Sequence, residues 1–409
     1  MSLEMTNQLG QQIVEAEKYF EKYRAMIPAT EKYIYMNSGG CGPMPGNVLR
    51  SMEDIFEKMT EEGQVNPEVH RWLKQILEDV RIEVAQYINA KPEEIFFVRC
   101  IAEGLNTIVR MFPWSENEEI LISNQENPAS ILPCYSFETI MKIVTKEFEG
   151  RGNKEDIISS FKAGLGEKTK LAVMSHVFHT TGAEIPAREL CRMAEERGVV
   201  TVLDGAQAAG NIPIDVKDIG CSFYLLSCHK WLLGPEGIAA VYIREDLIDK
   251  VRVPFGGVGM QDDFDSDTHQ IHYKPSAKRF EYGGRHIPMY AAFGETIRFA
   301  KLIGTDRIYA HTRLLHQYLR QQIELLETDI EFLSPEDERL QTAIFALRIP
   351  GKNHREIVKR AWEEERLIIQ WRTENLRTKE EGLRISLNWF VQKKDIDKLV
   401  KFLKRMIEE

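Results

Sequence analysis

The sequence lacks the paired cysteines that bind zinc or build a disulfide framework. Its six cysteines stand far apart, at positions 41, 100, 134, 191, 221 and 228. Most of them lie in apolar stretches, which is typical of buried free thiols. The sequence therefore indicates neither a disulfide-stabilised fold nor a metal site.

Long hydrophobic runs and basic stripes are missing as well. No apolar run approaches the roughly 18 residues of a membrane span, and the N-terminus lacks the basic-then-apolar pattern of a signal peptide. The 63 acidic and 53 basic residues give a net charge of -10 and are spread along the chain. No basic stripe is offered to a nucleic-acid backbone. We expect a cytoplasmic protein with a small-molecule partner, and neither nucleic acid nor membrane.

The rest of the composition is that of a globular protein. The chain has 409 residues, 43% of them hydrophobic, which is enough for two domains or for one large α/β domain with an appendage. Short apolar strands such as "EIFFV", "KLAVMSHV", "VVTVLD" and "FYLLS" alternate with amphipathic helices. This alternation predicts an α/β fold with a mainly parallel sheet and helices on both faces.

The two ends of the chain have other patterns. An N-terminal helix leads into "YIYMNSGGCGPMP", whose glycines and prolines indicate a loop. Residues 252–285 are rich in loop signals, and two long helices follow them. The tail then offers the strands "TAIFALRI" and "LRISL" with helices between and after them. We expect this tail to form a smaller α+β domain.

Polar residues follow two strands of the predicted sheet at the point where each strand ends. Asp204 and Gln207 follow one strand, and Ser227, His229 and Lys230 follow the next. Ligands collect at the carboxyl ends of parallel strands, so these side chains are expected to share one crevice. A buried aspartate needs a cation and a buried lysine needs to lose its charge. Pyridoxal 5'-phosphate meets both needs, with a pyridinium nitrogen for Asp204 and an aldehyde that forms a Schiff base with Lys230.

Taken singly, each of these residues has a more common structural explanation. Lys230 resembles a surface lysine, Asp204 the N-cap of a following helix and His229 a hydrogen-bonded structural histidine. Arg384 in "LRISL" suits the solvent side of a strand. These explanations would have to coincide at positions whose order and spacing match one active site, so we favour the functional interpretation.

The motifs also resemble a known family. "DGAQAAGNIPID" followed by "SCHKWLLGPEGIAAVYIRED" is similar to the class V branch of the fold type I pyridoxal-phosphate enzymes, which contains cysteine desulfurases, selenocysteine lyases and isopenicillin N epimerases. The N-terminal "YIYMNSGGCGPMP" resembles the family's substrate loop, "AEGLN" its phosphate loop, "SHVFHTTG" its strand beside the cofactor ring and "GLRISLNWF" its carboxylate-binding segment. The spelling "CHKWL" is closest to the epimerase-like members.

This resemblance implies roles at the cofactor. Lys230 would be the Schiff-base lysine and proton shuttle, and Asp204 the partner of the pyridine nitrogen. Gln207 would face the phenolic oxygen. Ser227 and His229 would hold the phosphate. They would be helped by backbone amides at a helix opening with Ala102, Glu103 and Gly104.

The resemblance also implies a substrate side and three departures from the family. Arg384 would pair with the substrate carboxylate, with Asn37 and Gly39 in the substrate loop. Ala102 stands where relatives carry a threonine, Asn127 where they carry a ring-stacking aromatic or histidine, and Gly284 where a threonine comes from the neighbouring subunit. His179 lies beside the ring, with a cofactor or a structural role. Each departure removes a cofactor contact.

The family implies three segments and a homodimer that binds an amino-acid substrate. Residues 1–45 would form the N-terminal helix and substrate loop, as part of the small domain. Residues 46–290 would form the large cofactor-binding domain and 291–409 the small domain. Chemistry at the α-carbon leaves epimerization, transamination and elimination open. The alternatives are a Schiff-base aldolase barrel and a degenerate, non-catalytic member of the family.

Overall fold

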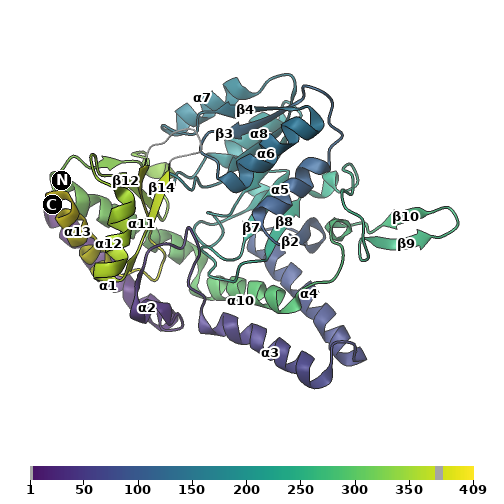
Figure 1. Cartoon of the computed structure of the whole chain (residues 1–409), viewed down its shortest axis with the longest axis horizontal. Helices are drawn as coiled ribbons and strands as arrows, with labels where there is room; N and C mark the ends of the chain where they lie inside the picture. Colours follow the sequence, from purple (N-terminus) through teal and green to yellow (C-terminus); the bar gives the residue numbers. More distant parts are fainter. Residues whose placement is uncertain (1–2, 374–380) are drawn as a thin grey trace.

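A seven-stranded open sheet forms the centre of the molecule. The structure is a computed structural model that describes residues 3–373 and 381–409 (Figure 1). The strand order is β2-β8-β7-β6-β5-β3-β4. All neighbours are parallel except β8, which runs antiparallel to β2 and β7. The strands are β2 (Ile95–Val98), β3 (Glu119–Ser123), β4 (Val144–Phe148), β5 (Thr169–Ser175), β6 (Val200–Asp204), β7 (Phe223–Ser227) and β8 (Ala239–Ile243).

Both faces of this sheet are buried because alternate residues of its strands enter two different cores. Leu203 belongs to the core shared with α4, α7, α8 and α10, and its neighbour Val202 belongs to the core shared with α5 and α6. The helices around the sheet are α3 (Gly46–Glu62), α4 (Pro67–Tyr87), α5 (Ile101–Arg110), α6 (Pro128–Met141), α7 (Lys154–Gly164), α8 (Ala187–Glu195), α9 (Val216–Ile219) and α10 (Ile287–Ile303). The prediction of a mainly parallel α/β sheet covered on both faces is confirmed. The aldolase barrel is wrong, because the sheet is open.

A second, antiparallel sheet of order β11-β12-β15-β14 lies in the C-terminal part. It packs with three C-terminal helices and with the N-terminal helix around one hydrophobic core. The chain ends lie near each other on this side of the molecule (Figure 1). The elements are α1 (Leu3–Arg24), α11 (Thr305–Glu324), β11 (Glu331–Phe332), β12 (Ile344–Arg348), α12 (His354–Glu365), β14 (Gln370–Thr373), β15 (Glu381–Ser386) and α13 (Lys393–Glu408). The division at residues 45 and 290 remains a prediction.

Short elements connect these parts. The pair of β1 (Ile34–Tyr35) and β13 (Leu367–Ile368) fixes the N-terminal loop beside the C-terminal sheet. The others are α2 (Ala29–Lys32) and the 3-10 helices η1 (Pro92–Glu94), η2 (Glu245–Leu247), η3 (Ala277–Phe280) and η4 (Glu338–Leu340). Within the ranges described, no helix combines the length and the apolar character that crossing a bilayer requires.

Residues 252–285 differ from the sequence-based expectation of loop. They contain a hairpin of β9 (Gln261–Asp265) and β10 (Gln270–Tyr273), which projects from the molecule in Figure 1. The strand "QDDFD" is mostly exposed and acidic, so it lacks the apolar alternation by which a strand is recognised.

Candidate active site

The candidate site lies where β6 and β7 end at the same edge of the sheet. Asp204 is the last residue of β6 and pairs in register with Leu225 of β7. Three residues after β7 comes Lys230, over which the N-terminal loop is folded. The Gly42 amide donates to the His229 carbonyl at 2.7 Å, and a Cβ on Gly42 would lie 2.2 Å from the Lys230 carbonyl oxygen. Only glycine allows this close approach.

Asp204 is buried, and both of its carboxylate oxygens accept hydrogen bonds. Oδ1 accepts from the Ala206 amide at 2.8 Å, and Oδ2 accepts from the Ser130 hydroxyl of α6 at 2.8 Å. The residues after Asp204 form turns and no helix. The helix N-cap explanation is therefore wrong, and the two hydrogen bonds hold the carboxylate in place, although Asp204 is not among the residues that line the cavity of Lys230.

Lys230 presents its amine to the site without a hydrogen bond or ion pair within the described residues. Burial lowers the pKa of the Lys230 amine to about 8. The charge of Asp204 opposes this shift and that of Arg384 adds to it. A lowered pKa leaves a sizeable fraction of the amine neutral near pH 8, which makes it a better nucleophile. The explanation of Lys230 as an ordinary surface lysine does not fit this position.

A cavity of about 420 Å³ joins Lys230 to the C-terminal sheet. Five residues predicted for the site line it, and they come from five separate segments of the chain. Three neighbouring residues of β14 line it as well. The lining residues are Gly39, Gly40, Asn127, Pro128, His179, Lys230, Gln370, Trp371, Arg372 and Arg384.

Arg384 on β15 is buried and faces this cavity. Its Nη2 donates to Asn37 Oδ1 at 3.2 Å, and its Nε has no hydrogen-bond partner within the described residues. Burial lowers the pKa of the guanidinium to about 10, so it still carries its charge at neutral pH. The Gly39 amide donates to Ser386 Oγ at 3.0 Å, which places the loop against the same strand. Asn37, Gly39 and Arg384 therefore meet, and the solvent-side explanation of Arg384 is wrong.

Gln207 ties the N-terminal loop to the segment after β7. Its Nε2 donates to the Gly39 carbonyl at 2.9 Å, and its Oε1 accepts from Trp231 Nε1 at 2.8 Å. It does not line the cavity of Lys230. Its role toward the phenolic oxygen remains a prediction.

The predicted phosphate side is formed by the end of β7 and the start of α5. Ser227 Oγ and His229 Nδ1 lie 3.1 Å apart, and burial lowers the pKa of His229, with Lys230 adding to the effect. At the start of α5, the Glu103 carboxylate accepts from the Arg99 amide at 2.5 Å. The first amides of a helix have no partner within it, which suits Ala102 and Glu103.

Gly104 does not share that role. Its amide already donates to the Cys100 carbonyl at 3.1 Å. A Cβ on Gly104 would lie 2.7 Å from Leu225 Cδ2. The glycine allows α5 to approach β7, so it positions the helix.

Asn127 and His179 line the same cavity with different partners. Asn127 is the N-cap of α6, where its Oδ1 accepts from the Ala129 amide at 2.9 Å. The buried Nδ1 of His179 has no hydrogen-bond partner in the part of the chain that the structure describes. Burial lowers the pKa of His179 well below its usual value, and the charges of Arg384, Arg372 and Lys230 lower it further. The imidazole is therefore neutral.

Gly284 lies apart from these residues. It lines a different cavity of about 580 Å³, together with Arg99, Glu103 and Arg285. It does not reach the cavity of Lys230 within one chain. That Gly284 lies at the cofactor site of a neighbouring subunit stays a prediction.

Sequence reasoning missed two features of the site. The first is β14, because "QWR" is no apolar run, although its polar-aromatic-polar alternation is a strand signal. Residues 374–380 of the loop predicted after it lie outside the described residues. The second is Glu126, which is buried and accepts from Ser123 Oγ at 2.5 Å and from Ser175 Oγ at 2.6 Å. Burial raises the pKa of Glu126 to about 7.

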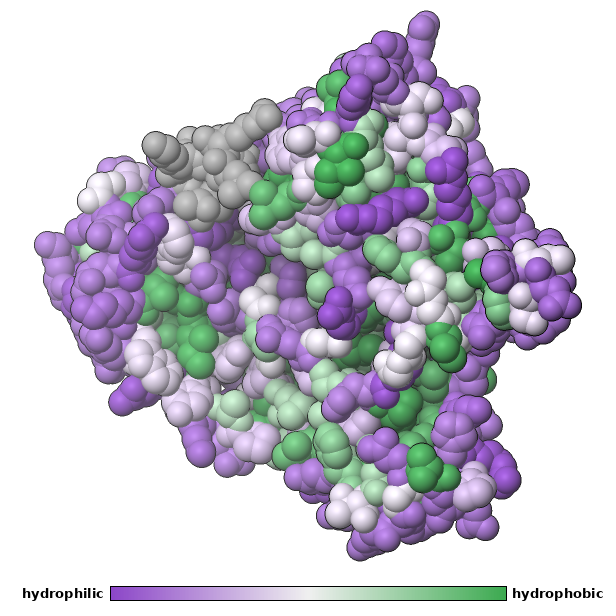
Figure 2. All heavy atoms as spheres, turned by 45° about the vertical axis from the view of Figure 1, so that its right-hand side comes forward, coloured by the Kyte–Doolittle hydropathy of each residue, from purple (hydrophilic) through white to green (hydrophobic). Residues whose placement is uncertain are grey.

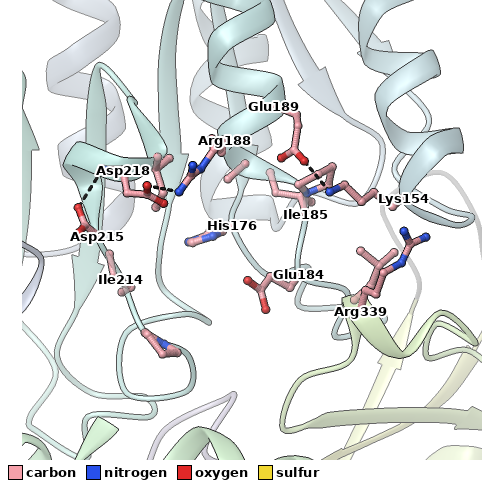
Figure 3. Close-up of a pocket in the computed structure, with 15 residues that line it drawn as sticks. Lys154, His176, Glu184, Ile185, Arg188, Glu189, Ile214, Asp215, Asp218 and Arg339 are labelled. Carbon is pink, nitrogen blue, oxygen red and sulfur yellow. Dashed lines mark hydrogen bonds and ion pairs between the residues drawn. The ribbon is translucent and has the colours of Figure 1, made fainter. Parts of the chain in front are cut away.

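A further cavity, of about 440 Å³, lies beside α8 and is lined by His176, Glu184 and several charged residues. Figure 3 shows Lys154 facing Glu189 and Arg188 facing Asp218 in this cavity. Lys154 pairs with Glu189 at 2.5 Å, and Arg188 pairs with Asp218. These two pairs satisfy each other's charge, whereas the residues that line the cavity of Lys230 include His179, whose Nδ1 has no hydrogen-bond partner within the described residues, and Arg384, whose Nε has none either. We therefore place the active site at Lys230.

The residues at Lys230 fit pyridoxal phosphate. A cavity-facing amine with a lowered pKa suits the aldehyde, and a buried carboxylate suits the ring nitrogen. The start of α5 suits the phosphate. These are predicted roles, which rest on the chemistry of the donor groups.

Comparisons with known proteins agree with this chemistry. The family model "Aminotransferase class-V" matches residues 34–399. Isopenicillin N epimerase of Amycolatopsis lactamdurans is 26% identical over 91% of this chain and 94% of that protein. Cysteine desulfurase of Cronobacter sakazakii is 30% identical over 68% of each chain. The apo structure of a cysteine desulfurase from Thermococcus onnurineus superposes with a TM-score of 0.86 at 22% identity, covering 95% of this chain and 98% of that one.

The match spans the N-terminal loop, both strand ends and the C-terminal sheet, so it includes every part of the chain that contributes to the site. The protein is a pyridoxal-phosphate-dependent enzyme and belongs to the aminotransferase class-V family.

Proposed function

We propose that the enzyme acts at the α-carbon of an amino acid, with Lys230 as the residue that bonds to the cofactor and then moves the α-proton. The observation that supports this most is the position of the Lys230 amine. It faces a cavity that also contains Arg384, and Asp204 lies near enough to influence its pKa. A nucleophile, a carboxylate-binding group and a ring-nitrogen partner are thus present in one site.

When bound, pyridoxal phosphate supplies an aldehyde for an amine and a ring that accepts negative charge from the α-carbon. Arg384 holds the substrate carboxylate through its guanidinium, and Asn37 Oδ1 orients that guanidinium by accepting a hydrogen bond from Nη2. Asp204, fixed by Ser130 and Ala206, holds a proton on the ring nitrogen. Lys230 Nζ removes or returns the α-proton, for which its lowered pKa is suited.

An epimerase-like or lyase-like reaction is favoured over transamination. The relative named isopenicillin N epimerase aligns over nearly the whole of both chains, and cysteine desulfurases align over shorter shares. Return of the proton to the other face of the α-carbon gives epimerization, and loss of a β-substituent gives elimination. Transamination is the alternative, because it needs the same residues.

We also propose a cytoplasmic homodimer. Gly284 lies away from the cavity of its own Lys230, which is consistent with a site that a neighbouring chain completes. Phe264 on the projecting hairpin and Val258 beside it expose apolar side chains. Figure 2 shows that hydrophilic residues cover the rim of this face and that hydrophobic ones are exposed nearer its middle. Sedimentation at the mass of one chain would contradict the dimer.

Borohydride trapping tests the proposed chemistry. The wild-type protein is expected to be yellow and, after reduction, to carry the cofactor covalently on Lys230. Lys230→Ala should keep its fold, because only its amine is used, and should carry no cofactor after reduction. Lys91→Ala, an exposed lysine paired with Glu245, is the control and should behave like the wild type. Intact-mass and peptide-mass analysis reads out both results.

The same experiment decides whether the protein is a degenerate, non-catalytic family member. A colourless wild-type protein with no trapped cofactor would support the degenerate member. A cofactor trapped on another lysine would contradict the assignment of Lys230.

A further inference from the structure

The cavity of about 440 Å³ beside α8 contains two side chains that take no part in its ion pairs. Lys154, Arg188 and Arg339, which line it, each pair with a carboxylate. His176 and Glu184 have no ion pair within the described residues, and Figure 3 shows both of them in this cavity. These two groups are therefore the ones that remain to bind a ligand.

His176 offers a hydrogen-bond donor to this cavity. Its side chain is only 4% exposed, and its Nδ1 lies 2.8 Å from the hydroxyl group of Tyr224. That buried hydroxyl group has no other partner within the described residues, so it donates to Nδ1, which assigns the ring proton to Nε2. Burial lowers the pKa of His176 to about 4, which keeps the ring neutral. The Nε2–H group has no acceptor among the described residues and is available to a ligand.

Glu184 offers the complementary group, an acceptor with negative charge. Its Oε2 accepts a long hydrogen bond of 3.5 Å from the Tyr309 hydroxyl group, and its Oε1 has no partner in the parts of the chain that the structure describes. Burial raises the pKa of this carboxyl group to about 7, although the charge of Arg313 and the Tyr309 hydroxyl group oppose the rise. A largely buried carboxylate without an ion pair is stabilised by a cation.

The first turn of α8 forms another wall of the cavity. The N-cap is Pro186, whose side chain accepts no hydrogen bond from the helix, and Arg188 and Glu189 of the first turn line the cavity. The N-terminus of a helix favours hydrogen-bond acceptors and negative groups. This wall therefore favours the same kind of ligand atom as the Nε2–H group of His176.

We propose that this cavity binds a small molecule that carries an ammonium group and a hydrogen-bond acceptor on a short chain, as an amino alcohol or an amino acid does. The ammonium group pairs with Glu184, and the acceptor takes the Nε2–H group of His176. Neither residue lines the cavity of Lys230, so the inference does not rest on the proposed function. The two sites are nevertheless neighbours, because the His176 amide donates to the Asp204 carbonyl at 2.9 Å.

Tertiary amines test the proposal, because they form no Schiff base at the other site. Dimethylethanolamine has both groups, dimethylpropylamine has a methyl group in place of the hydroxyl group, and isoamyl alcohol has carbon in place of the nitrogen. NMR titration of the full-length, cofactor-bound protein is expected to show dimethylethanolamine binding at least about tenfold more tightly than either of the others.

Dimethylglycine distinguishes the two kinds of ligand, because it has a carboxylate in place of the hydroxyl group. Tighter binding than that of dimethylethanolamine would assign the site to an amino acid. Weaker binding would assign it to an amino alcohol.

Two glutamate variants locate the binding of the ammonium group. Glu184→Gln should weaken the binding of dimethylethanolamine at least about tenfold and remove its preference over isoamyl alcohol. The variant should fold, because a pKa of about 7 means that the neutral carboxyl group is already present in the wild type. Glu189→Gln makes the same change of charge in the same cavity at a residue that pairs with Lys154, and should change the affinity less than about threefold.

Two variants of His176 locate the binding of the acceptor. His176→Asn keeps an acceptor for Tyr224 near the position of Nδ1 and removes the Nε2–H group. It should remove the preference for dimethylethanolamine over dimethylpropylamine. His176→Gln returns an N–H group near the position of Nε2 and should restore part of this preference.

Three outcomes would overturn the proposal. The first is equal affinity of the wild type for dimethylethanolamine, dimethylpropylamine and isoamyl alcohol. The second is binding of dimethylethanolamine that Glu184→Gln leaves unchanged, and the third is no measurable binding at millimolar concentrations. Thermal unfolding of each variant is measured alongside, so that a loss of binding is read from folded protein.

Discussion

Asp204 shows how single residues set the chemistry of this site. Both of its oxygens accept hydrogen bonds, from Ser130 and Ala206, so the carboxylate is held in place before any cofactor binds. An amide at this position would keep most of that geometry and lose the negative charge. The charge is what keeps the ring nitrogen protonated.

We expect Asp204→Asn to retain pyridoxal phosphate and to lower kcat by at least about a hundredfold, the size of effect that follows loss of one preorganised electrostatic contact. The measurement is turnover of a responsive amino acid, with cofactor content determined in the same samples. Ser130→Ala, which removes one hydrogen bond to the carboxylate, should lower kcat much less. Near-normal turnover of Asp204→Asn would show that this residue does not tune the ring nitrogen.

Glu126 is a second buried carboxyl group close to Asp204, and it makes stability depend on pH. Burial raises its pKa from 4.5 to about 7, with the charge of Asp204 adding to the shift. Because the pKa of Glu126 is higher in the folded than in the unfolded state, its protonated carboxyl contributes to the free energy of unfolding. This contribution is fully present below pH 4.5 and is lost as the pH rises through about 7. A shift from 4.5 to about 7 corresponds to a change in the free energy of unfolding of about 3 kcal/mol.

Glu126→Gln should therefore flatten the fall in Tm between pH 5 and pH 8 and raise Tm at pH 8 relative to the wild type. Thermal unfolding of the apo protein at both pH values measures this. Glu53→Gln, at an exposed position, controls for the loss of one negative charge. Glu184, whose pKa burial also raises to about 7, leaves some pH dependence in every variant. Equal slopes for the wild type and Glu126→Gln would contradict the prediction.

At the scale of elements, the sequence predicted the positions of site residues that directly follow an apolar strand. Asp204, Ser227 and Lys230 follow buried strands, so their place at one sheet edge could be inferred from local pattern and the parallel arrangement. β14 could not be inferred in this way. Its place depends on pairing with β15, and its polar residues gave no core signal.

Contacts between elements far apart in the chain could not be predicted from the sequence either. The bond from Gln207 to the Gly39 carbonyl joins residues 168 positions apart. Glu126 adjoins the predicted site residue Asn127. Its buried carboxylate accepts hydrogen bonds from Ser123 and Ser175, which lie on two neighbouring strands. A single sequence does not reveal such partners, because the pairing is set by tertiary packing and not by local propensity.

The position of α5 against β7 is an element-scale property that can be tested at Gly104. An added Cβ would meet Leu225 Cδ2 at 2.7 Å and Val241 Cγ2 at 3.1 Å, so the helix would have to shift. Gly104→Ala is expected to cost about 1–3 kcal/mol in stability and to weaken cofactor binding, because the start of α5 moves. Thermal unfolding and cofactor titration measure the two effects. Gly46→Ala, where an added Cβ would meet only the Met26 carbonyl oxygen at 3.8 Å, is the matched control for stability.

At the scale of the whole molecule, the placement of cysteines bears on whether this enzyme transfers sulfur as a cysteine desulfurase does. The resemblance to cysteine desulfurases implies that desulfurization would need an acceptor cysteine thiolate on the segment before the carboxylate-binding arginine. The last cysteine in this sequence is Cys228, which precedes Lys230. Cys134, Cys191, Cys221 and Cys228 are all buried, and Cys100, although exposed, is not among the residues that line the cavity of Lys230.

Cys41 is the remaining candidate, and its surroundings keep it protonated. Burial raises the pKa of the thiol, and Glu236 raises it further, while Lys230 opposes both effects. A thiol is a nucleophile only as its thiolate, so a raised pKa makes it a poor acceptor of sulfur. We therefore expect no persulfide on the protein after incubation with cysteine, and no sustained production of alanine.

Sulfide release under a reductant, together with mass analysis of every cysteine-containing peptide, measures this outcome. Cys41→Ala should leave any slow alanine production unchanged, because that production does not pass through the thiol. This prediction does not extend to selenocysteine, whose leaving group departs more easily and needs no acceptor thiol. A persulfide on Cys41 or Cys228 with sustained alanine production, lost in the corresponding alanine variant, would show that a thiol outside the family's usual position takes the sulfur.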